Sequence, residues 1–256
     1  LRKNLECHLM TNDDMTDRLR IGLVVPRADS QVPAEAALMY PEIEFVAAGV
    51  GVSALTPEGY ESAWHGIVPA AAKLAEQGVH AVMVMGASLT FYRGYQSHEE
   101  LMQNVQRVTG LPVSSMSAAA VDALRELEVR NVGVCTAYSD EINERLGRFL
   151  ADSGFTVCAL RGLGLENFDA PRQVGPHDVI SLVRCAVEES SSGVQGLLIS
   201  CGGLKTLDLT PQLEREHGLP VVSSTPAALR SAAHLLGVGH GLAGLGRLLG
   251  RHQPST

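Results

Sequence analysis

Short apolar runs recur along the chain at spacings that predict buried strands separated by helices. Continuous runs of about four to eight apolar residues are typical of strands covered on both faces. Such runs lie at residues 21–26, 43–50, 81–85, 132–136, 156–160 and 197–200. Helices are predicted between them, over residues 33–40, 60–77, 97–109, 139–153 and 176–190. The alternation predicts an α/β protein with parallel sheets.

The helix predicted over residues 60–77 has recognisable ends. Thr56 is suited to be its N-cap, and Pro57 follows at the first helical position. Gly78 is placed to stop it. We therefore expect one continuous helix between these signals.

The second half of the chain repeats the plan of the first. GLPVSSMSA at residues 110–118 matches GLPVVSSTPA at residues 218–227 once one residue is inserted. In each half this segment follows a short loop after a buried strand, at residues 86–88 and 200–203. We therefore expect two similar Rossmann-like lobes. A ligand would lie in the cleft between them, because parallel sheets bind ligands at the carboxyl ends of their strands.

The repeat also predicts how the chain is divided. The first lobe would span residues 18–117 and be closed by a helix at about residues 226–240, and the second would span residues 118–225. Residues 1–17 lack periodicity and are expected to form a disordered extension. Residues 241–256 are rich in glycine and are expected to form a flexible tail.

Net charge and residue spacing limit the kinds of molecule that the protein is expected to bind. A net charge of −8 argues against nucleic acid, whose phosphates require clustered basic residues. No apolar run approaches the roughly 18 residues of a membrane helix. The histidines lack metal-site spacing, and the five cysteines form no CxxC pair, which favours reduced thiols in the cytoplasm. We expect a small-molecule ligand, no metal and no membrane partner, and the oligomeric state stays open.

The candidate chemistry lies at predicted strand ends. Cys201 ends an apolar strand and precedes Gly202 and Gly203, which would let a substrate approach the backbone. Ser88 and Tyr138 follow two other strands. Together with backbone N–H groups near the glycines, their hydroxyls could surround an anion. A thiol or a tyrosine at such a place can also be packing only, and both alternatives stay open here.

Two further motifs are weak. GVGVSA at residues 49–54 matches a dinucleotide-binding fingerprint, but Thr56 and Pro57 come before any helix begins. GASLT at residues 86–90 has only half of a serine nucleophile elbow, and no histidine is placed as its base. Neither nucleotide binding nor serine hydrolysis is expected.

Four segments resemble a known family. MGASLTFYRG at residues 85–94, TAYSDEINERL at 136–146, SCGGLKTLD at 200–208 and LTPEGY at 55–60 are similar to arylmalonate decarboxylases of the aspartate/glutamate racemase superfamily. The resemblance implies two α/β lobes with pseudo-twofold symmetry, an active site between them and no cofactor. It runs over about residues 21–227.

The resemblance also implies roles for single residues. Cys201 matches the proton donor, while Ser88, Tyr138 and the amides at residues 201–203 would hold one carboxylate of a disubstituted malonate. The other carboxylate would leave as CO2 from apolar surroundings, and the enediolate would be protonated on one face. The binding loops would include Gly86, Ala87 and Pro26. The pocket would be lined by Val52, Leu55, Tyr60, Phe168 and Pro171.

The chain departs from the family pattern in several places. Gly86 stands where racemases and isomerases carry a second cysteine. Ala87 replaces a threonine, and losing such a donor can cost on the order of 3 kcal/mol of transition-state stabilisation. Arg27 follows Pro26 in place of a second proline. Phe168 and Pro171 also differ from the family's pocket residues.

These departures keep other functions open. The leading hypothesis is a cofactor-independent decarboxylase of an α-substituted malonate or related dicarboxylate. One alternative is an isomerase or racemase of the superfamily, similar to maleate isomerase or of the ectoine-utilisation type. Another is a non-catalytic protein that binds carboxylates.

Overall fold

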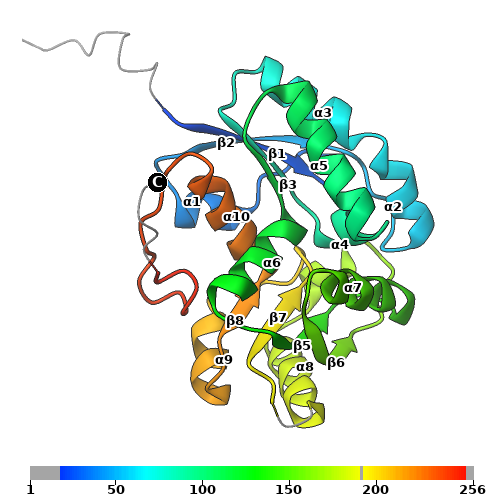
Figure 1. Ribbon diagram of the computed structural model, residues 1–256, viewed down its shortest axis with the longest axis vertical. Coiled ribbons are helices and arrows are strands. Elements are labelled where there is room, and N and C mark those ends of the chain that lie inside the picture. Colours follow the sequence, from blue (N-terminus) through cyan, green and yellow to red (C-terminus); the bar gives the residue numbers. More distant parts are fainter. Residues whose placement is uncertain (1–17, 191–192, 252–256) are drawn as a thin grey trace, which may run out of the picture.

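Two parallel four-stranded sheets of the same strand order form the framework of the protein (Figure 1). The computed structural model describes residues 18–190 and 193–251. In the first sheet the order is β2-β1-β3-β4, with β1(Arg20–Val25), β2(Glu44–Gly49), β3(Ala81–Val84) and β4(Val113–Ser115). In the second the order is β6-β5-β7-β8, with β5(Asn131–Thr136), β6(Thr156–Gly162), β7(Gly196–Ser200) and β8(Val221–Ser223). The α/β class and the two similar lobes are thus confirmed.

The strands are apolar runs because helices cover both faces of each sheet. All residues of β3 and β7 are buried. The register is parallel throughout, with Ile21 of β1 opposite Ala81 of β3. The carboxyl ends of the central strands therefore lie together at one edge of each sheet.

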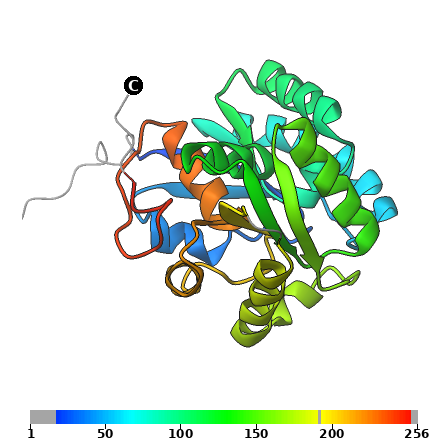
Figure 2. The ribbon, with the colours of Figure 1, turned by 60° about the horizontal axis from the view of Figure 1, so that its bottom comes forward.

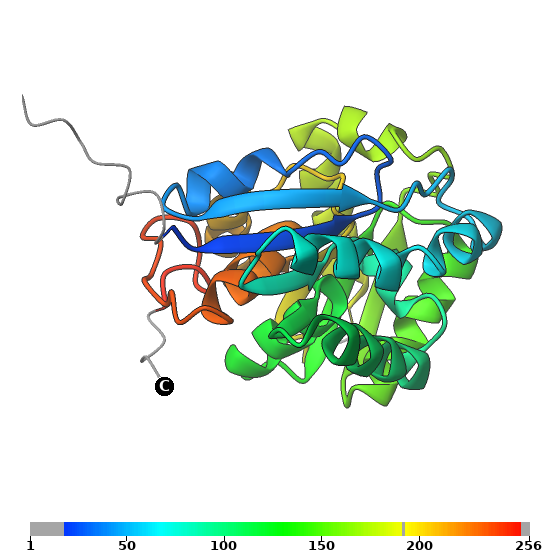
Figure 3. The same cartoon turned by 90° about the horizontal axis from the view of Figure 1, so that it is seen from above.

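Eleven helical segments surround the sheets in the part of the chain that the structure describes. The first half holds α1(Ala34–Met39), α2(Pro57–Trp64), α3(Ile67–Glu76), α4(Ala87–Phe91) and α5(Tyr95–Thr109). The second holds α6(Met116–Glu126), α7(Asp140–Asp152), η2(Ala170–Gln173), α8(Pro176–Glu189), α9(Thr210–His217) and α10(Ser224–His234). Strands β1 and β2 run side by side (Figure 3), and α8 lies close to α9 beside the second sheet (Figure 2). None of the described helices has the length and apolar character to cross a membrane.

The helix predicted over residues 60–77 is wrong as a single element. Its start is confirmed, since the Thr56 hydroxyl accepts the Gly59 N–H at 3.4 Å. The helix ends at Trp64, however, and α3 begins at Ile67 after a turn. Pro69 explains the break, because it has no N–H to donate to the carbonyl of His65 four residues earlier.

Helices α6 and α10 lie between the two sheets (Figure 1). Each follows the last strand of its own sheet, and the two pack against each other. Helix α6 also contacts β7 and β8, while α10 contacts β3 and β4. The two helices thus join the lobes, although the division at residue 117 itself stays a prediction.

The glycine-rich segment after residue 241 contacts the rest of the protein, and its expected flexibility stays a prediction. Leu248 and Leu249 are each only 4% exposed. The Leu242 N–H donates to the Leu249 carbonyl, and the Arg251 guanidinium donates to the Glu126 carbonyl at 2.8 Å. The leucines between the glycines anchor the segment up to Arg251. The predictions for residues 1–17 and 252–256 lie outside the described residues.

Candidate functional site

A cavity of about 730 Å³ lies at the carboxyl ends of the strands of both sheets. Its wall includes residues that directly follow β1, β3 and β7, and Tyr138, which lies two residues after β5, as the parallel topology requires. Of the residues predicted for the site, all but Val52 line it. They are Pro26, Leu55, Tyr60, Gly86, Ala87, Ser88, Tyr138, Phe168, Pro171, Cys201, Gly202 and Gly203.

Cys201 follows the last residue of β7 and is 7% exposed. Burial raises the pKa of its thiol to about 11, because a thiolate is poorly solvated there. The backbone N–H groups of Gly203 and Leu204 and the Tyr138 hydroxyl favour the thiolate and limit that rise. At neutral pH the group is therefore a protonated thiol.

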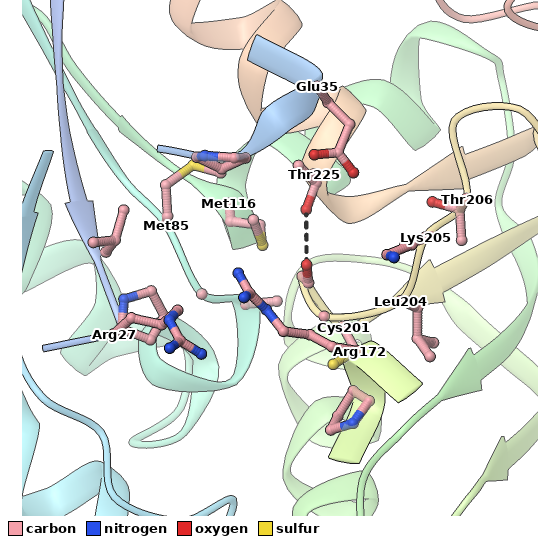
Figure 4. A pocket seen from close by; sticks show the side chains of 18 of the residues that line it. Arg27, Glu35, Met85, Met116, Arg172, Cys201, Leu204, Lys205, Thr206 and Thr225 are labelled. Carbon is pink, nitrogen blue, oxygen red and sulfur yellow. Dashed lines mark hydrogen bonds between the residues drawn. The ribbon is translucent and has the colours of Figure 1, made fainter. Parts of the chain in front are cut away.

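The loop after Cys201 is held by close packing (Figure 4). A Cβ on Gly203 would come within 2.8 Å of the Pro171 Cβ, so η2 lies directly against this loop. On the other side the Thr225 hydroxyl donates to the Gly202 carbonyl at 3.4 Å. These contacts explain the glycine at 203 and fix the backbone next to the thiol.

Ser88 lies in the first turn of the short helix α4 and is 6% exposed. A buried hydroxyl network anchors this helix. The Ala87 carbonyl accepts from both Thr90 and Ser117 at 3.0 Å, and those two hydroxyls are 2.6 Å apart. The Thr90 hydroxyl is thus engaged behind the helix and does not replace the hydroxyl absent at Ala87.

Gly86 precedes α4 in a conformation that favours glycine. Its φ of +94° lies in the left-handed region, and a Cβ there would be 2.6 Å from the Cγ of Pro26. Cys201 belongs to the second lobe. The wall that the first lobe contributes therefore carries no side chain at position 86.

Tyr138 is fully buried, two residues beyond the end of β5. Its N–H donates to the Thr136 hydroxyl, and its carbonyl accepts from Asn143 and Gly164. Burial raises the pKa of its phenol well above the ordinary value, while nearby hydroxyls of Ser88 and Ser200 act in the opposite direction. The phenol is thus a fixed neutral donor.

Tyr60 on α2 brings a second phenol to the cavity. It is 1% exposed, and its hydroxyl has no hydrogen-bond partner among the described residues. Burial raises its pKa, and the Ser88 hydroxyl is close enough to oppose that rise. A buried donor without a partner is available to a ligand.

Val52 does not line the cavity. It is 5% exposed and belongs to the apolar core. Its N–H donates to the Pro26 carbonyl at 2.8 Å, which holds residue 52 behind the loop that forms the wall. The structure thus places Val52 in the core behind the cavity wall.

Arg27 lies in the wall but is already paired. Its guanidinium donates to both carboxylate oxygens of Asp29, at 2.7 and 3.0 Å, and to Asp169 of the second lobe. These carboxylates raise the pKa of Arg27. They also balance the positive charge of Arg27 within the protein.

Sequence reasoning missed several residues of the wall, among them Met116, Thr225, Arg172, Lys205 and Glu35. Met116 and Thr225 follow β4 and β8, so their places at strand ends were a usable signal. The others lie on segments whose placement is set by packing. No group of three or more His, Cys, Asp or Glu side chains among the described residues could hold a metal ion.

Comparison with known proteins finds that the chain is similar to arylmalonate decarboxylases and maleate isomerases. A curated arylmalonate decarboxylase from Bordetella bronchiseptica is 42% identical over 219 residues, which are 86% of this chain and 91% of that protein. A crystal structure of arylmalonate decarboxylase matches with a TM-score of 0.82 at 40% identity, covering 90% of this chain and 98% of that one. Maleate isomerase from Nocardia farcinica is 27% identical over 241 residues, which are 90% of this chain and 95% of that protein.

The family model described as arylmalonate decarboxylase matches residues 21–249. Apart from Arg20, the first residue of β1, this range includes both sheets, and it contains every residue of the cavity wall. The chain belongs to the arylmalonate decarboxylase family.

Proposed function

We propose that the protein is a cofactor-independent decarboxylase of an α-substituted malonate and that Cys201 is its proton donor. The observation that carries the proposal is a single protonated thiol facing a cluster of neutral donors in one cavity. Cys201 is the only cysteine in the described wall of that cavity. The donors are the hydroxyls of Ser88 and Tyr138 and the N–H groups after Cys201.

In this reaction the two carboxylates of the substrate have different surroundings and different fates. The donors bind one of them, and the other lies against apolar side chains such as Leu55 and Phe168. When the bond from Cα to the second carboxylate breaks, CO2 leaves and the electron pair forms an enediolate on the bound carboxylate. The Cys201 proton then passes to Cα, and water reprotonates the thiolate.

The thiol count favours decarboxylation over isomerisation. Gly86 stands where the isomerases of the superfamily carry their second cysteine, and Cys135, Cys158 and Cys185 do not line the cavity. A single acid can protonate one face, whereas a two-thiol mechanism needs a group on each side. Ala87 leaves fewer donors on the bound carboxylate, and we expect slower turnover than with threonine there.

We further propose a small carboxylate as the ligand and the cytoplasm as the location. The ligand follows from the donors around the cavity and from the relatives. The location is supported by Cys135, Cys158, Cys185 and Cys201, which are free thiols.

The first prediction tests the proton donor. Phenylmalonate is incubated with the protein, and CO2 release is measured. Cys201→Ser should lower kcat by about a hundredfold or more, since serine is a much weaker acid than a positioned thiol. Cys158→Ser, which removes a thiol outside the cavity, should retain turnover. Full turnover by Cys201→Ser, or none by the unmodified protein on any malonate, would contradict the proposal.

A further inference from the structure

The cavity carries cationic side chains that the proposed decarboxylation does not use. Its wall includes Arg27, Arg172 and Lys205, although the bound carboxylate needs only neutral donors. Decarboxylation also needs the second carboxylate to be poorly solvated. Water can solvate Arg172 and Lys205, which are exposed, so the question is what these cations bind once a substrate fills the cavity.

Arg27 is explained within the protein. Its guanidinium is held by Asp29 and Asp169, two carboxylates on opposite sides of the cleft. Its pair with Asp169 connects the two lobes. Asp29 and Asp169 therefore already have a cationic partner in Arg27.

Arg172 is different, because the described residues supply it with no ion pair within 4.0 Å. It lies on η2, whose Pro171 is buried against Gly203 of the thiol loop. Its side chain is exposed and reaches over the cavity between Arg27 and Cys201 (Figure 4). Its charge helps lower the pKa of Asp29, although more weakly than Arg27 does. The packing of η2 thus directs a cation without a partner toward the space beside the thiol.

Lys205 adds a second cation on the same loop as Cys201 and is exposed. Glu35 and Asp208 also line the cavity, but neither forms an ion pair with Arg172 or Lys205 in the part of the chain that the structure describes. These two cations are available to an anionic ligand.

Arg172 is unsuited to hold either carboxylate of the malonate. One is bound by the neutral donors. A guanidinium on the other would stabilise the carboxylate that must lose its charge as CO2 leaves, and so would raise the barrier. The remaining possibility is an anion elsewhere on the substrate. A cavity of about 730 Å³ has space for such a substituent, since pockets of about 300–1,000 Å³ bind drug-sized ligands.

We propose that Arg172 binds a carboxylate carried at the end of the substrate's α-substituent, with Lys205 adding attraction at the rim. This inference rests on the proposed decarboxylase function and specifies its substrate class: a malonate whose side chain is itself anionic. Arg172 is then a specificity residue that takes no part in proton transfer.

The second prediction compares two substrates that differ by one carboxylate, benzylmalonate and (4-carboxybenzyl)malonate. The unmodified protein should show kcat/KM about ten- to a hundredfold higher for the carboxylated substrate, the range of one charge-assisted hydrogen-bonded contact. In Arg172→Met this ratio should fall towards one, mainly through KM. Arg172→Lys should keep part of it. Arg148→Met, which removes an exposed arginine of α7 outside the cavity wall, should leave the ratio unchanged.

The outcomes separate this inference from the function on which it rests. Turnover of benzylmalonate with a ratio near one, or a ratio that Arg172→Met does not change, overturns the inference and leaves the decarboxylase function standing. If neither substrate turns over, the proposed function fails. Calorimetric titration of both malonates then decides the inference: tighter binding of the carboxylated compound that Arg172→Met abolishes supports it, and equal binding overturns it.

Discussion

At the scale of single residues, burial decides which form of Cys201 the protein holds. A thiol with a pKa of about 11 is almost entirely protonated at neutral pH, which suits a proton donor and disfavours a nucleophile. In the unfolded chain the thiol ionises near its ordinary value of 9.0. Between these values the unfolded state loses the proton first, so this group's contribution to stability is present below pH 9 and falls as the pH rises towards 11.

The third prediction follows from this pKa. Iodoacetamide should alkylate Cys201 slowly at pH 8 in the folded protein, and the rate should rise about tenfold per pH unit until near pH 11, because only the thiolate reacts. The alkaline decline of decarboxylase activity should likewise lie near pH 11. Peptide mass spectrometry gives the labelled fraction, with the exposed Cys185 as an internal reference. A half-maximal rate near pH 9 would contradict the burial argument.

The sequence allowed much of the site to be predicted, but not all of it. Cys201, Ser88 and Tyr138 follow strands, and parallel topology brings such residues together. Arg172 was missed because its direction depends on the packing of Pro171 against Gly203, which no local pattern records. The role assigned to each residue stays a prediction.

At the scale of elements, helices α6 and α10 are joined by a partly buried ion pair. Arg230 of α10 is 5% exposed, and its guanidinium donates to both carboxylate oxygens of Glu126 on α6 at 2.8 Å. Such two-point pairing is geometrically specific. Because these helices lie between the sheets, the pair also holds the two halves of the chain together.

The fourth prediction concerns this pair. Arg230→Met should lower the free energy of unfolding by about 2–3 kcal/mol, because the two charge-assisted hydrogen bonds to Glu126 are lost. Arg184→Met is the matched control, since its pair with Glu216 is exposed and should contribute less than about 1 kcal/mol. Urea unfolding measures both. Equal effects of the two substitutions would show that burial adds nothing to the pair.

Elements with clear periodicity were predictable, and short ones were not. The apolar runs gave the six longer strands, and the helix at residues 97–109 is found as Tyr95–Thr109. Helix α4 was missed because its five residues are too few for a periodic pattern and are anchored by Thr90 and Ser117. The break before α3 was missed because the apolar spacing continues across it.

At the scale of the whole molecule, a segment of the second lobe is hydrogen-bonded to the first. Ala54 and Asn167 form an isolated antiparallel bridge, and the Leu55 N–H donates to the Glu166 carbonyl at 2.8 Å. Asp169, which pairs with Arg27 of the first lobe, lies shortly after Asn167 in the same segment. The internal repeat predicted two lobes and a cleft, but these contacts join segments that do not repeat and could not be read from it.

The fifth prediction tests this connection. Arg27→Met should speed amide hydrogen exchange over residues 163–173, because the second lobe's segment loses its charged contact with the first. The melting temperature should change little, since the pair is open to solvent. Arg20→Met removes a pair within the first lobe and should leave exchange over residues 163–173 unchanged. Unchanged exchange in Arg27→Met would show that the backbone contacts alone hold the segment.

The close approach of Gly86 to Pro26 couples these two positions. A side chain at position 86 would need both a left-handed backbone and a displaced proline ring, because its Cβ would lie 2.6 Å from the Cγ of Pro26. A second thiol placed at position 86 should therefore fit with less strain when position 26 carries a smaller residue than proline.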